Sequence, residues 1–404
     1  MKEKVVIIGA SITGFYVMNE LVKQNFAGEI SIIDSKSVYP YNPYPLTKEW
    51  MMDLDNMEPP LLAEKSFYTE NNIDLRLNTT ITSINPEDQT ITTQGDETIP
   101  YDHLVIATGS TLRKLSLPGD DAEGVFYLRD FDDAKKIKRW ARDSENVVII
   151  GSGFIGLELA STFSQLGKKV SVVEKFGKPL ERVFGEEVSE YFVKMHRKHG
   201  VSFLFNDGAE KINTNADGHI SSVQLESGQT IDADMLLIAV GVEPNLSFDV
   251  EGLVSDRGII VNEYGETSLA NIYAGGDVVK WPYRDNLIHI EHWETAWSQG
   301  VSIAKNILNE KSNAYKVNPY FWTDQYDETF EYLGNSRVWD QTFFRGSFDD
   351  GKFAVAYVDS NNVPLAILFA NKIEKRKDIL NLLNKKQPLD ERRFGDMNIP
   401  VADM

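Results

Sequence analysis

Short apolar runs alternate with amphipathic stretches over the first three quarters of the chain. Residues 147–150 are all valine or isoleucine, as a buried parallel strand requires, and a glycine-rich turn follows them. The next segment spaces its apolar residues like a helix, stops at Gly167, and leads into a valine-rich run at residues 170–173. This order of strand, turn, helix and strand predicts a nucleotide-binding unit on a parallel sheet.

The turn of this unit, residues 151–156, carries three glycines with separate physical tasks. Gly151 permits a tight turn, Gly153 lets the backbone approach a pyrophosphate, and Gly156 brings the helix against the strand. Glu174 ends the second strand, where its carboxylate can accept from ribose hydroxyls and repel a 2′-phosphate. We therefore expect NADH in preference to NADPH. The alternative is a glycine loop without a ligand.

A second copy of the pattern opens the chain. It has a strand at residues 5–8, a turn at 9–14 and a further strand at 30–33 that ends at Asp34. Two such units suggest two bound dinucleotides. The turn departs from the pattern because Ser11 occupies the middle glycine position, where its Cβ hinders a close phosphate but its hydroxyl can donate to one.

The segments around these units complete the expected organisation. The proline-rich stretch 39–48 cannot form a helix or a central strand, so it predicts a rigid loop that carries Lys48 to a fixed place. Residues 73–93 alternate apolar and polar side chains, which predicts a small antiparallel sheet. Beyond residue 312, aromatic strands and a basic helical tail predict a further domain.

Composition narrows the range of functions. A chain of 404 residues predicts two or three domains, and its net charge of −20 argues against nucleic acid or an anionic membrane as partner. Apolar runs stay far below the roughly 18 residues of a membrane span, and the start lacks a signal-peptide pattern, so we expect a cytoplasmic protein. The absence of cysteine excludes disulfides and redox-active thiols, so redox chemistry must use a bound cofactor. The histidine spacing indicates no metal site.

Longer motifs extend this picture. The segments YDHLVIATGS and NIYAGGDVV, placed in this order with the two glycine units, resemble those of two-dinucleotide flavoproteins in the pyridine nucleotide-disulfide oxidoreductase superfamily. More narrowly, the chain resembles the FAD-dependent NADH:ferredoxin reductases of bacterial oxygenase systems, the putidaredoxin and rubredoxin reductase types. That resemblance covers nearly the whole chain and rests on PYNPYPLTK at residues 40–48, FYLRDFDDA at 126–134, EHWETAWSQG at 291–300 and WTDQY at 322–326.

The resemblance implies an α/β fold with two Rossmann-like dinucleotide-binding domains. The NAD domain is inserted into the FAD domain, and a C-terminal α+β domain covers the flavin. The expected boundaries are 1–112 and 241–312 for the FAD-binding domain, 113–240 for the NADH-binding domain and 313–404 for the C-terminal domain. The implied cofactors are FAD and NADH.

The resemblance also implies site residues by position. For FAD these are Gly9, Ser11, Ile12, Thr13, Gly14, Asp34, Ser35, Lys48, Ile81, Ala107, Thr108, Gly109, Arg129, Gly276, Asp277, Trp293 and Trp322. For NADH they are Gly151, Gly153, Phe154, Ile155, Gly156, Glu158, Glu174 and Gly241. Lys48, Glu158 and Trp322 are the implied catalytic residues, with Asp324 beside Trp322 over the flavin. Pro43 stands where the family commonly has an arginine, so one phosphate or flavin contact is missing or supplied elsewhere.

The residue types suit these roles, and each also has a plainer explanation. Lys48 can stabilise the negative charge of a reduced flavin, or it is a surface lysine after a turn. Asp277 follows two glycines, which suits close approach of a ligand, or it caps a helix. Glu158 can orient a carboxamide or favour the helix dipole, and Trp322 can cover the flavin or pack in a sheet core.

The expected function is hydride transfer from NADH to FAD and then single-electron transfer to a ferredoxin-type [2Fe–2S] protein or rubredoxin, an enzyme of EC 1.18.1 type. Because cysteine is absent, thiol-dependent reductases of the superfamily are excluded. A cysteine-independent NADH oxidase or quinone reductase, and an apoptosis-inducing-factor-like flavoprotein with a binding role, stay open. We expect a monomer or weak homodimer. Its basic tail, residues 372–393, is either the docking face for the acceptor or a solvated helix face.

Overall fold

The computed structural model describes residues 2–404, which form two compact units. The first unit contains residues 2–43, Glu58–Leu112 and Val242–Pro319. The second unit contains Tyr44–Met57, Arg113–Gly241 and Tyr320–Met404. The chain therefore leaves the first unit and returns to it twice. The four-part domain boundaries stay a prediction. In this division the expected NADH-binding and C-terminal domains share one unit with the loop that carries Lys48.

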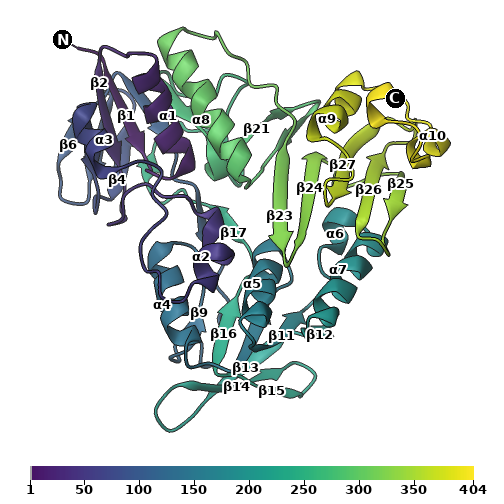
Figure 1. Ribbon diagram of the computed structural model, residues 1–404. Helices are drawn as coiled ribbons and strands as arrows, with labels where there is room; N and C mark the ends of the chain where they lie inside the picture. The colour runs from purple at the N-terminus through teal and green to yellow at the C-terminus, as the bar shows by residue number, and fades with distance from the viewer. Residues whose placement is uncertain (1) are drawn as a thin grey trace. The chain divides into compact units, whose positions relative to one another are not determined.

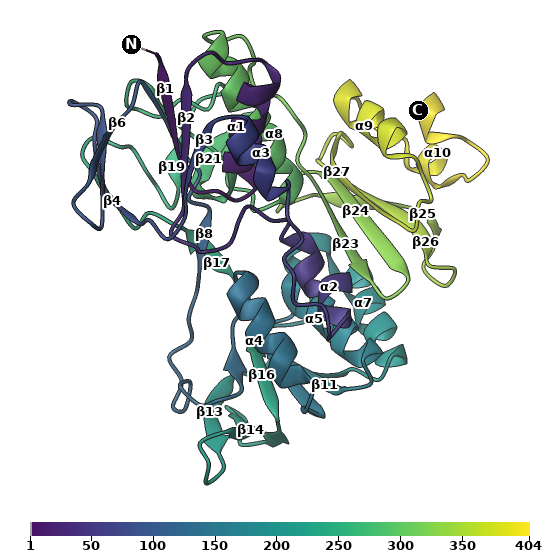
Figure 2. The same cartoon turned by 60° about the vertical axis from the view of Figure 1, so that its left-hand side comes forward.

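The first unit is built on a five-stranded parallel sheet (Figure 1). Its three central strands are largely buried and contain several valine and isoleucine residues. In spatial order the strands are β20 (Ile272–Ala274), β7 (His103–Ile106), β1 (Lys4–Ile8), β2 (Glu29–Ile33) and β3 (Ile73–Arg76). Helices α1 (Ile12–Lys23) and α8 (Trp293–Leu308) lie side by side (Figures 1 and 2). Gly300 permits this packing, because a Cβ there would lie 2.6 Å from the backbone oxygen of Thr13.

The predicted antiparallel sheet over residues 73–93 is wrong in part. β3 pairs parallel with β2 at the edge of the main sheet, and only β4 (Ile81–Asn85) and β5 (Thr90–Thr93) pair antiparallel within that range. An edge strand also alternates apolar and polar residues, so the pattern alone cannot separate the two arrangements.

The other elements of the first unit are short. They are α3 (Lys65–Glu70), β6 (Thr98–Pro100), β8 (Ser110–Leu112), β17 (Val242–Pro244), β18 (Asp249–Val250), β19 (Ile259–Ile260), η2 (Gly276–Val278), β21 (Val279–Tyr283) and β22 (Asn286–Ile288).

The second unit contains another five-stranded parallel sheet. In spatial order its strands are β12 (Ser202–Phe205), β11 (Lys169–Glu174), β10 (Asn146–Ile150), β16 (Met235–Ile238) and β9 (Val125–Phe126). The helices of this region are α4 (Phe131–Ala141), α5 (Phe154–Gln165), α6 (Glu181–Phe184) and α7 (Glu186–Lys198). A small sheet of β13 (Ala209–Thr214), β14 (Ile220–Leu225) and β15 (Thr230–Asp232) follows β12 in the chain.

The C-terminal part of the second unit is a five-stranded antiparallel sheet with a helical tail (Figure 2). Its strands are β23 (Tyr320–Gln325), β24 (Glu328–Gly334), β27 (Pro364–Ala370), β26 (Lys352–Val358) and β25 (Gln341–Ser347). The tail forms α9 (Arg376–Lys385), α10 (Glu391–Gly395) and η3 (Val401–Asp403). Buried Arg345 holds this tail, because its guanidinium pairs with Glu374 at 2.5 Å and donates to the backbone oxygen of Phe394 at 2.9 Å.

The loop of residues 44–57 forms η1 (Tyr44–Thr47) and α2 (Glu49–Met52) and is tied to α4. The Lys138 ammonium is fully buried and donates to the backbone oxygens of Asp53 and Asn56 at 2.8 and 2.7 Å. It also lies over the ring of Trp50, 3.2 Å from the ring centroid. No helix among residues 2–404 combines the length and apolarity needed to cross a bilayer.

Candidate active site

The turn between β1 and α1 is packed too closely for side chains at two positions. Gly9 has a φ of +102°, and a Cβ there would lie 2.2 Å from the backbone oxygen of Ala107. A Cβ at Gly14 would lie 1.9 Å from the backbone oxygen of Gly9. Ile12 is buried, whereas Ser11 is exposed at the helix N-terminus, where backbone N–H groups favour a phosphate.

Asp34, just after β2, holds this turn in place. Its Oδ2 accepts from the backbone N–H of Ala10 at 2.7 Å, and its Oδ1 accepts from that of Lys36 at 2.8 Å. Ser35 is exposed beside it. An acid beside an open helix N-terminus is the arrangement that binds the ribose and pyrophosphate of a dinucleotide.

The glycine turn after β20 lies against the start of α1. Gly276 has a φ of +79°, and a Cβ there would lie 2.3 Å from the hydroxyl oxygen of Thr13. The N–H of Gly276 donates to the Gln299 side chain at 2.8 Å. Asp277 accepts from the hydroxyl of Ser110 at 3.0 Å, which orients its carboxylate.

Several of the residues expected at FAD lie where the parallel strands of the first unit end, whereas Lys48, Arg129 and Trp322 belong to the second unit. β1, β2, β7 and β20 run in the same direction, so their carboxyl ends share one edge of the sheet. Thr108 and Gly109 follow β7, and the Thr108 hydroxyl donates to the backbone oxygen of Asn245 at 2.7 Å. Ile81 is buried at the start of β4, and Trp293 begins α8. Tight glycine cradles with an acid at this edge fit the phosphates and ribose of FAD.

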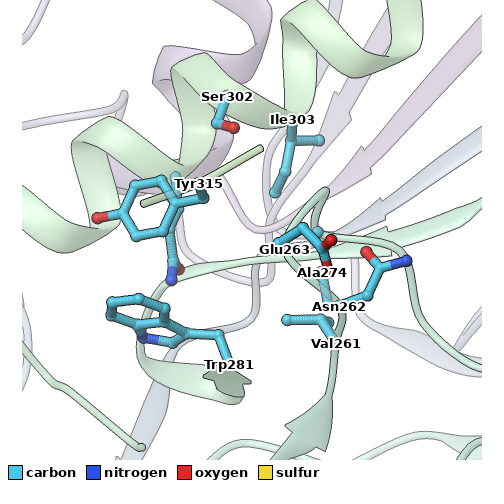
Figure 3. A pocket seen from close by; sticks show the side chains of 10 residues that line it. Val261, Asn262, Glu263, Ala274, Trp281, Ser302, Ile303 and Tyr315 are labelled. Atoms are coloured by element: carbon cyan, nitrogen blue, oxygen red, sulfur yellow. The ribbon is translucent and has the colours of Figure 1, made fainter. Parts of the chain in front are cut away.

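The pocket in Figure 3 is too small for a substrate. Trp281, Tyr315 and Ile303 line it, and its volume is about 10 Å³, which is room for about one water molecule. Gln299, whose side chain holds Gly276, lines the same cavity. It is therefore a packing space behind the glycine turn.

In the second glycine turn, between β10 and α5, two glycines allow close packing and the third faces open space. Gly151 has a φ of +99°, and a Cβ there would lie 2.4 Å from the backbone oxygen of Ala239. A Cβ at Gly156 would lie 2.1 Å from the backbone oxygen of Gly151. A Cβ added at Gly153 or Gly241 would have no atom of residues 2–404 within 4 Å, apart from those of its neighbours in the chain. Two glycines thus serve packing, and Gly153 leaves the turn open to a ligand.

Glu174 closes this turn from the end of β11. One of its oxygens accepts from the backbone N–H and the hydroxyl of Ser152 at 2.9 and 2.7 Å, and the other accepts from the N–H of Phe176 at 3.0 Å. Lys175 pairs with Glu226 at 2.7 Å. The preference for NADH over NADPH stays a prediction.

A cluster of charged and hydroxyl side chains forms around Glu158 of α5. The Glu158 carboxylate accepts from the hydroxyls of Thr47 at 2.5 Å and Thr323 at 2.7 Å. The Lys48 ammonium lies 3.4 Å from Glu158 Oε1 and 3.2 Å from Asp324 Oδ2. Burial raises the pKa of the Glu158 carboxyl above its usual range, while Lys48 and the two hydroxyls oppose that rise.

The three implied catalytic residues therefore lie together in the second unit. The Lys48 ammonium is 5.6 Å from the ring centroid of Trp322, and the Lys48 side chain is only 12% exposed. The explanation of Lys48 as a free surface residue is wrong. Trp322 is half-buried and stacks beside Tyr320, with the ring centroids 6.1 Å apart.

Comparisons with known proteins place the chain in a family. Residues 3–300 match the pyridine nucleotide-disulphide oxidoreductase family, and residues 320–404 match the reductase C-terminal domain. The chain belongs to the pyridine nucleotide-disulphide oxidoreductases.

Its relatives match over nearly their whole length. Rhodocoxin reductase from Rhodococcus erythropolis is 32% identical over 400 residues, which cover 98% of this chain and 93% of that protein. Putidaredoxin reductase from Pseudomonas putida is 29% identical over 409 residues, covering 100% and 96%. A crystal structure of the covalent putidaredoxin reductase–putidaredoxin complex matches with a TM-score of 0.94 and 29% identity, covering 99% of this chain and 97% of that one.

Several predictions about this pyridine nucleotide-disulphide oxidoreductase are confirmed. The α/β fold with two dinucleotide-binding regions and a C-terminal domain is correct, as are the oxidoreductase class and its use of FAD and NADH. The individual cofactor contacts stay predictions.

Two of the residues expected at the cofactors, Phe154 and Arg129, make contacts within the second unit. Phe154 packs edge-on against Phe321, with ring centroids 4.7 Å apart, while the neighbouring Ile155 is 44% exposed. The backbone N–H of Arg129 donates to Asp133 at the start of α4.

Sequence reasoning missed the hydroxyl groups of the oxidoreductase site. Thr47 lies inside the PLTK motif and Thr323 inside WTDQY, yet neither was singled out beside Lys48 and Trp322. The available signal was strand alternation, because Thr323 occupies the strand face opposite to that of Trp322.

Proposed function

We propose that this oxidoreductase is an FAD-dependent NADH:ferredoxin reductase, which takes two electrons from NADH as a hydride and delivers them singly to a ferredoxin-type iron–sulfur protein. The observation that carries this proposal is the buried Lys48–Glu158 cluster in a chain without cysteine. A flavoprotein without thiols must pass electrons from the flavin itself to its partner. The names of its relatives, reductases of rhodocoxin and putidaredoxin, support a protein acceptor.

The cluster fixes the position of one ammonium group, that of Lys48. FAD, when bound, would supply the redox chemistry. Lys48 would stabilise the negative charge that develops there, because its ammonium is held between the carboxylates of Glu158 and Asp324. The half-buried ring of Trp322, beside Lys48, offers a flat apolar surface to an aromatic cofactor.

Helix α5 connects the coenzyme site to this cluster. Its N-terminus and the open turn at Gly153 would bind the NADH pyrophosphate, and Glu174 would bind a ribose. Glu158 lies one turn further along the same helix. The helix that holds the coenzyme therefore also holds the partner of Lys48, so alignment for hydride transfer depends on one rigid element.

The electron acceptor we propose is a [2Fe–2S] ferredoxin or a rubredoxin. We also propose that the reductase itself is a monomer or weak homodimer in the cytoplasm. With a net charge of −20, the chain as a whole repels an acidic partner, so a local basic face must attract it. Helix α9 offers such a face. Lys377 and the preceding Lys375 are exposed, whereas Arg376 lies over the ring of Tyr320, 3.4 Å from its centroid.

Steady-state oxidation of NADH with a panel of acceptors tests the reaction. We expect fast turnover with a [2Fe–2S] ferredoxin or rubredoxin and slow turnover with oxygen or a quinone. Fast oxygen or quinone reduction with no response to any iron–sulfur protein would favour the oxidase or quinone reductase. Negligible turnover with every acceptor, in a protein that still binds FAD, would favour a binding role.

Charge reversal tests the docking face. We expect the double substitution Lys375→Glu/Lys377→Glu to raise KM for ferredoxin and flatten its salt dependence, with the rate of flavin reduction by NADH unchanged. The matched control is Lys194→Glu/Lys198→Glu on α7, which changes the net charge equally through two other exposed lysines. Equal effects of the two double substitutions would assign the tail to a solvated face.

A further inference from the structure

A chain of hydrogen bonds runs from Glu158 through β23 to α7. The Thr323 hydroxyl is 2.7 Å from Glu158 Oε1, and the Gln325 amide nitrogen is 3.1 Å from the Thr323 oxygen. The Gln325 amide oxygen is 2.8 Å from Nε2 of His196, whose Nδ1 is 3.0 Å from the Tyr326 hydroxyl. Thr323, Gln325 and His196 are completely buried.

The chemistry of the groups fixes the direction of every bond. An ionised Glu158 can only accept, so the Thr323 hydroxyl donates to it, and the Thr323 oxygen accepts from the amide N–H of Gln325. The Gln325 amide oxygen must then accept from Nε2–H of His196. The neutral ring leaves Nδ1 to accept from the Tyr326 hydroxyl. In all four hydrogen bonds the donated hydrogen points toward Glu158, so each hydrogen bond polarises the next one.

The fold builds this chain with rigid elements. Thr323 and Gln325 are two residues apart on β23, so they share the face toward α5. Tyr326 turns away from the strand with a φ of +57°, and its N–H donates to the hydroxyl of Ser161 on α5 at 2.8 Å. Burial lowers the pKa of His196 to about 4, so the ring is neutral at physiological pH.

We propose that His196 and Gln325 are positioning residues that keep the Thr323 hydroxyl donating to Glu158 and so keep Glu158 ionised as the partner of Lys48. This inference rests on the function proposed above. Without the N–H of His196, the Gln325 amide can turn over and present its oxygen to Thr323. The Thr323 hydroxyl then donates to Gln325, and Glu158 loses one of its hydrogen bonds.

The first test determines the direction of the hydrogen bonds around His196 in the unaltered FAD-loaded protein. Nitrogen-15 NMR of labelled histidine, with His196 assigned by its loss in His196→Phe, reports which ring nitrogen carries the proton. We expect the neutral Nε2–H form between pH 6 and 8. A proton on Nδ1 would reverse the direction of the hydrogen bonds and overturn the proposal.

The second test measures the pKa of Glu158 by carbon-13 NMR of labelled glutamate, assigned with Glu158→Gln. A hydrogen bond to a charged group corresponds to about 1 pKa unit, so we expect His196→Phe and Thr323→Val each to raise the pKa of Glu158 by about 1. Thr323→Ser keeps the hydroxyl and should restore the original value. Ser164→Ala is the matched control and should leave the value unchanged, because the hydroxyl it removes donates to the backbone oxygen of Ser161 at 3.0 Å and lies 3.1 Å from the Tyr326 hydroxyl, outside the four bonds that lead to Glu158.

Combining His196→Phe with Thr323→Val separates positioning from general packing. If His196 acts through the Thr323 hydroxyl, the double variant should raise the pKa of Glu158 no further than either single variant. Additive effects, or an unchanged pKa in His196→Phe, would overturn the proposal in an enzyme that still reduces ferredoxin. Absence of ferredoxin reduction in the unaltered protein would instead overturn the proposed function and leave the NMR results standing.

Discussion

The substitution Lys48→Met isolates the charge of Lys48 while keeping most of its side-chain volume. It leaves the buried Glu158 carboxylate without the ammonium that lies 3.4 Å away. Asp324 also loses this partner, but its side chain is 41% exposed and is solvated by water, so that loss contributes little. The cost of the substitution therefore falls on Glu158.

The distance sets an upper limit to this cost. At 3.4 Å and an effective dielectric constant of about 20, the attraction between the two charges is about 5 kcal/mol. Removing one partner of a buried pair typically costs about 3–5 kcal/mol, so we expect a loss of about 3 kcal/mol in the free energy of unfolding at pH 8. The two threonine hydroxyls still donate to the carboxylate and moderate the loss.

The loss should depend on pH with a defined sign. Burial already raises the folded-state pKa of Glu158 above its unfolded value, and removing Lys48 raises it further. A carboxyl with a raised pKa favours the folded state when protonated, and this advantage disappears as pH rises through the folded pKa. Lys48→Met should therefore be less destabilised at pH 5.5 than at pH 8.

Denaturant unfolding of the FAD-loaded protein and the variant at the two pH values measures this difference. The double variant Lys48→Met/Glu158→Gln is the control, because it removes both charges. Because it has no carboxyl at position 158, its stability relative to the unaltered protein should vary less between the two pH values than that of Lys48→Met. A Lys48→Met variant that is equally destabilised at both pH values, or a double variant no more stable than Lys48→Met at pH 8, would refute the reasoning.

Three further changes test other parts of the molecule. Glu174→Ala should lower the ratio of kcat/KM for NADH over NADPH roughly tenfold, because a ribose bond and a repulsion are both lost; an unchanged ratio would remove Glu174 from the ribose. Gly156→Ala should unfold the protein or its NADH site, since the new Cβ would lie 2.1 Å from a backbone oxygen, whereas Gly153→Ala should fold normally and raise only KM for NADH. Lys138→Met should speed amide hydrogen exchange in the loop that follows α2, and Lys136→Met, exposed on the same helix, should not.

The parts of the fold that could be predicted from sequence are those set by neighbouring residues. The glycine turns, their strands and α4 follow from local pattern, and Asp130 and Asp133 cap α4 reciprocally as that pattern favours. The antiparallel prediction for β3 failed because sheet membership depends on which strand lies beside it, and alternation does not carry that information.

The charged and aromatic residues of the site could be predicted from the sequence. The contacts that join segments far apart in the chain could not. Lys48 and Trp322 stand out by motif and residue type. The hydroxyls that complete the site belong to Thr47 and Thr323, which lie 111 and 165 residues from Glu158 in the chain. Threonine in a loop or strand is ordinary, so only the folded arrangement marks these two.

The arrangement around Glu158 explains how a buried carboxylate can serve as the partner of Lys48. A carboxylate in an apolar interior stays ionised only if several donors face it at once. Here the donors come from η1 and β23, and they meet Glu158 on α5, with α7 behind them. Because these segments are far apart in sequence, they converge only when the whole second unit is folded. The charge that we assign to flavin chemistry is therefore a property of the complete unit, and loosening any one of these elements should act on the same carboxylate.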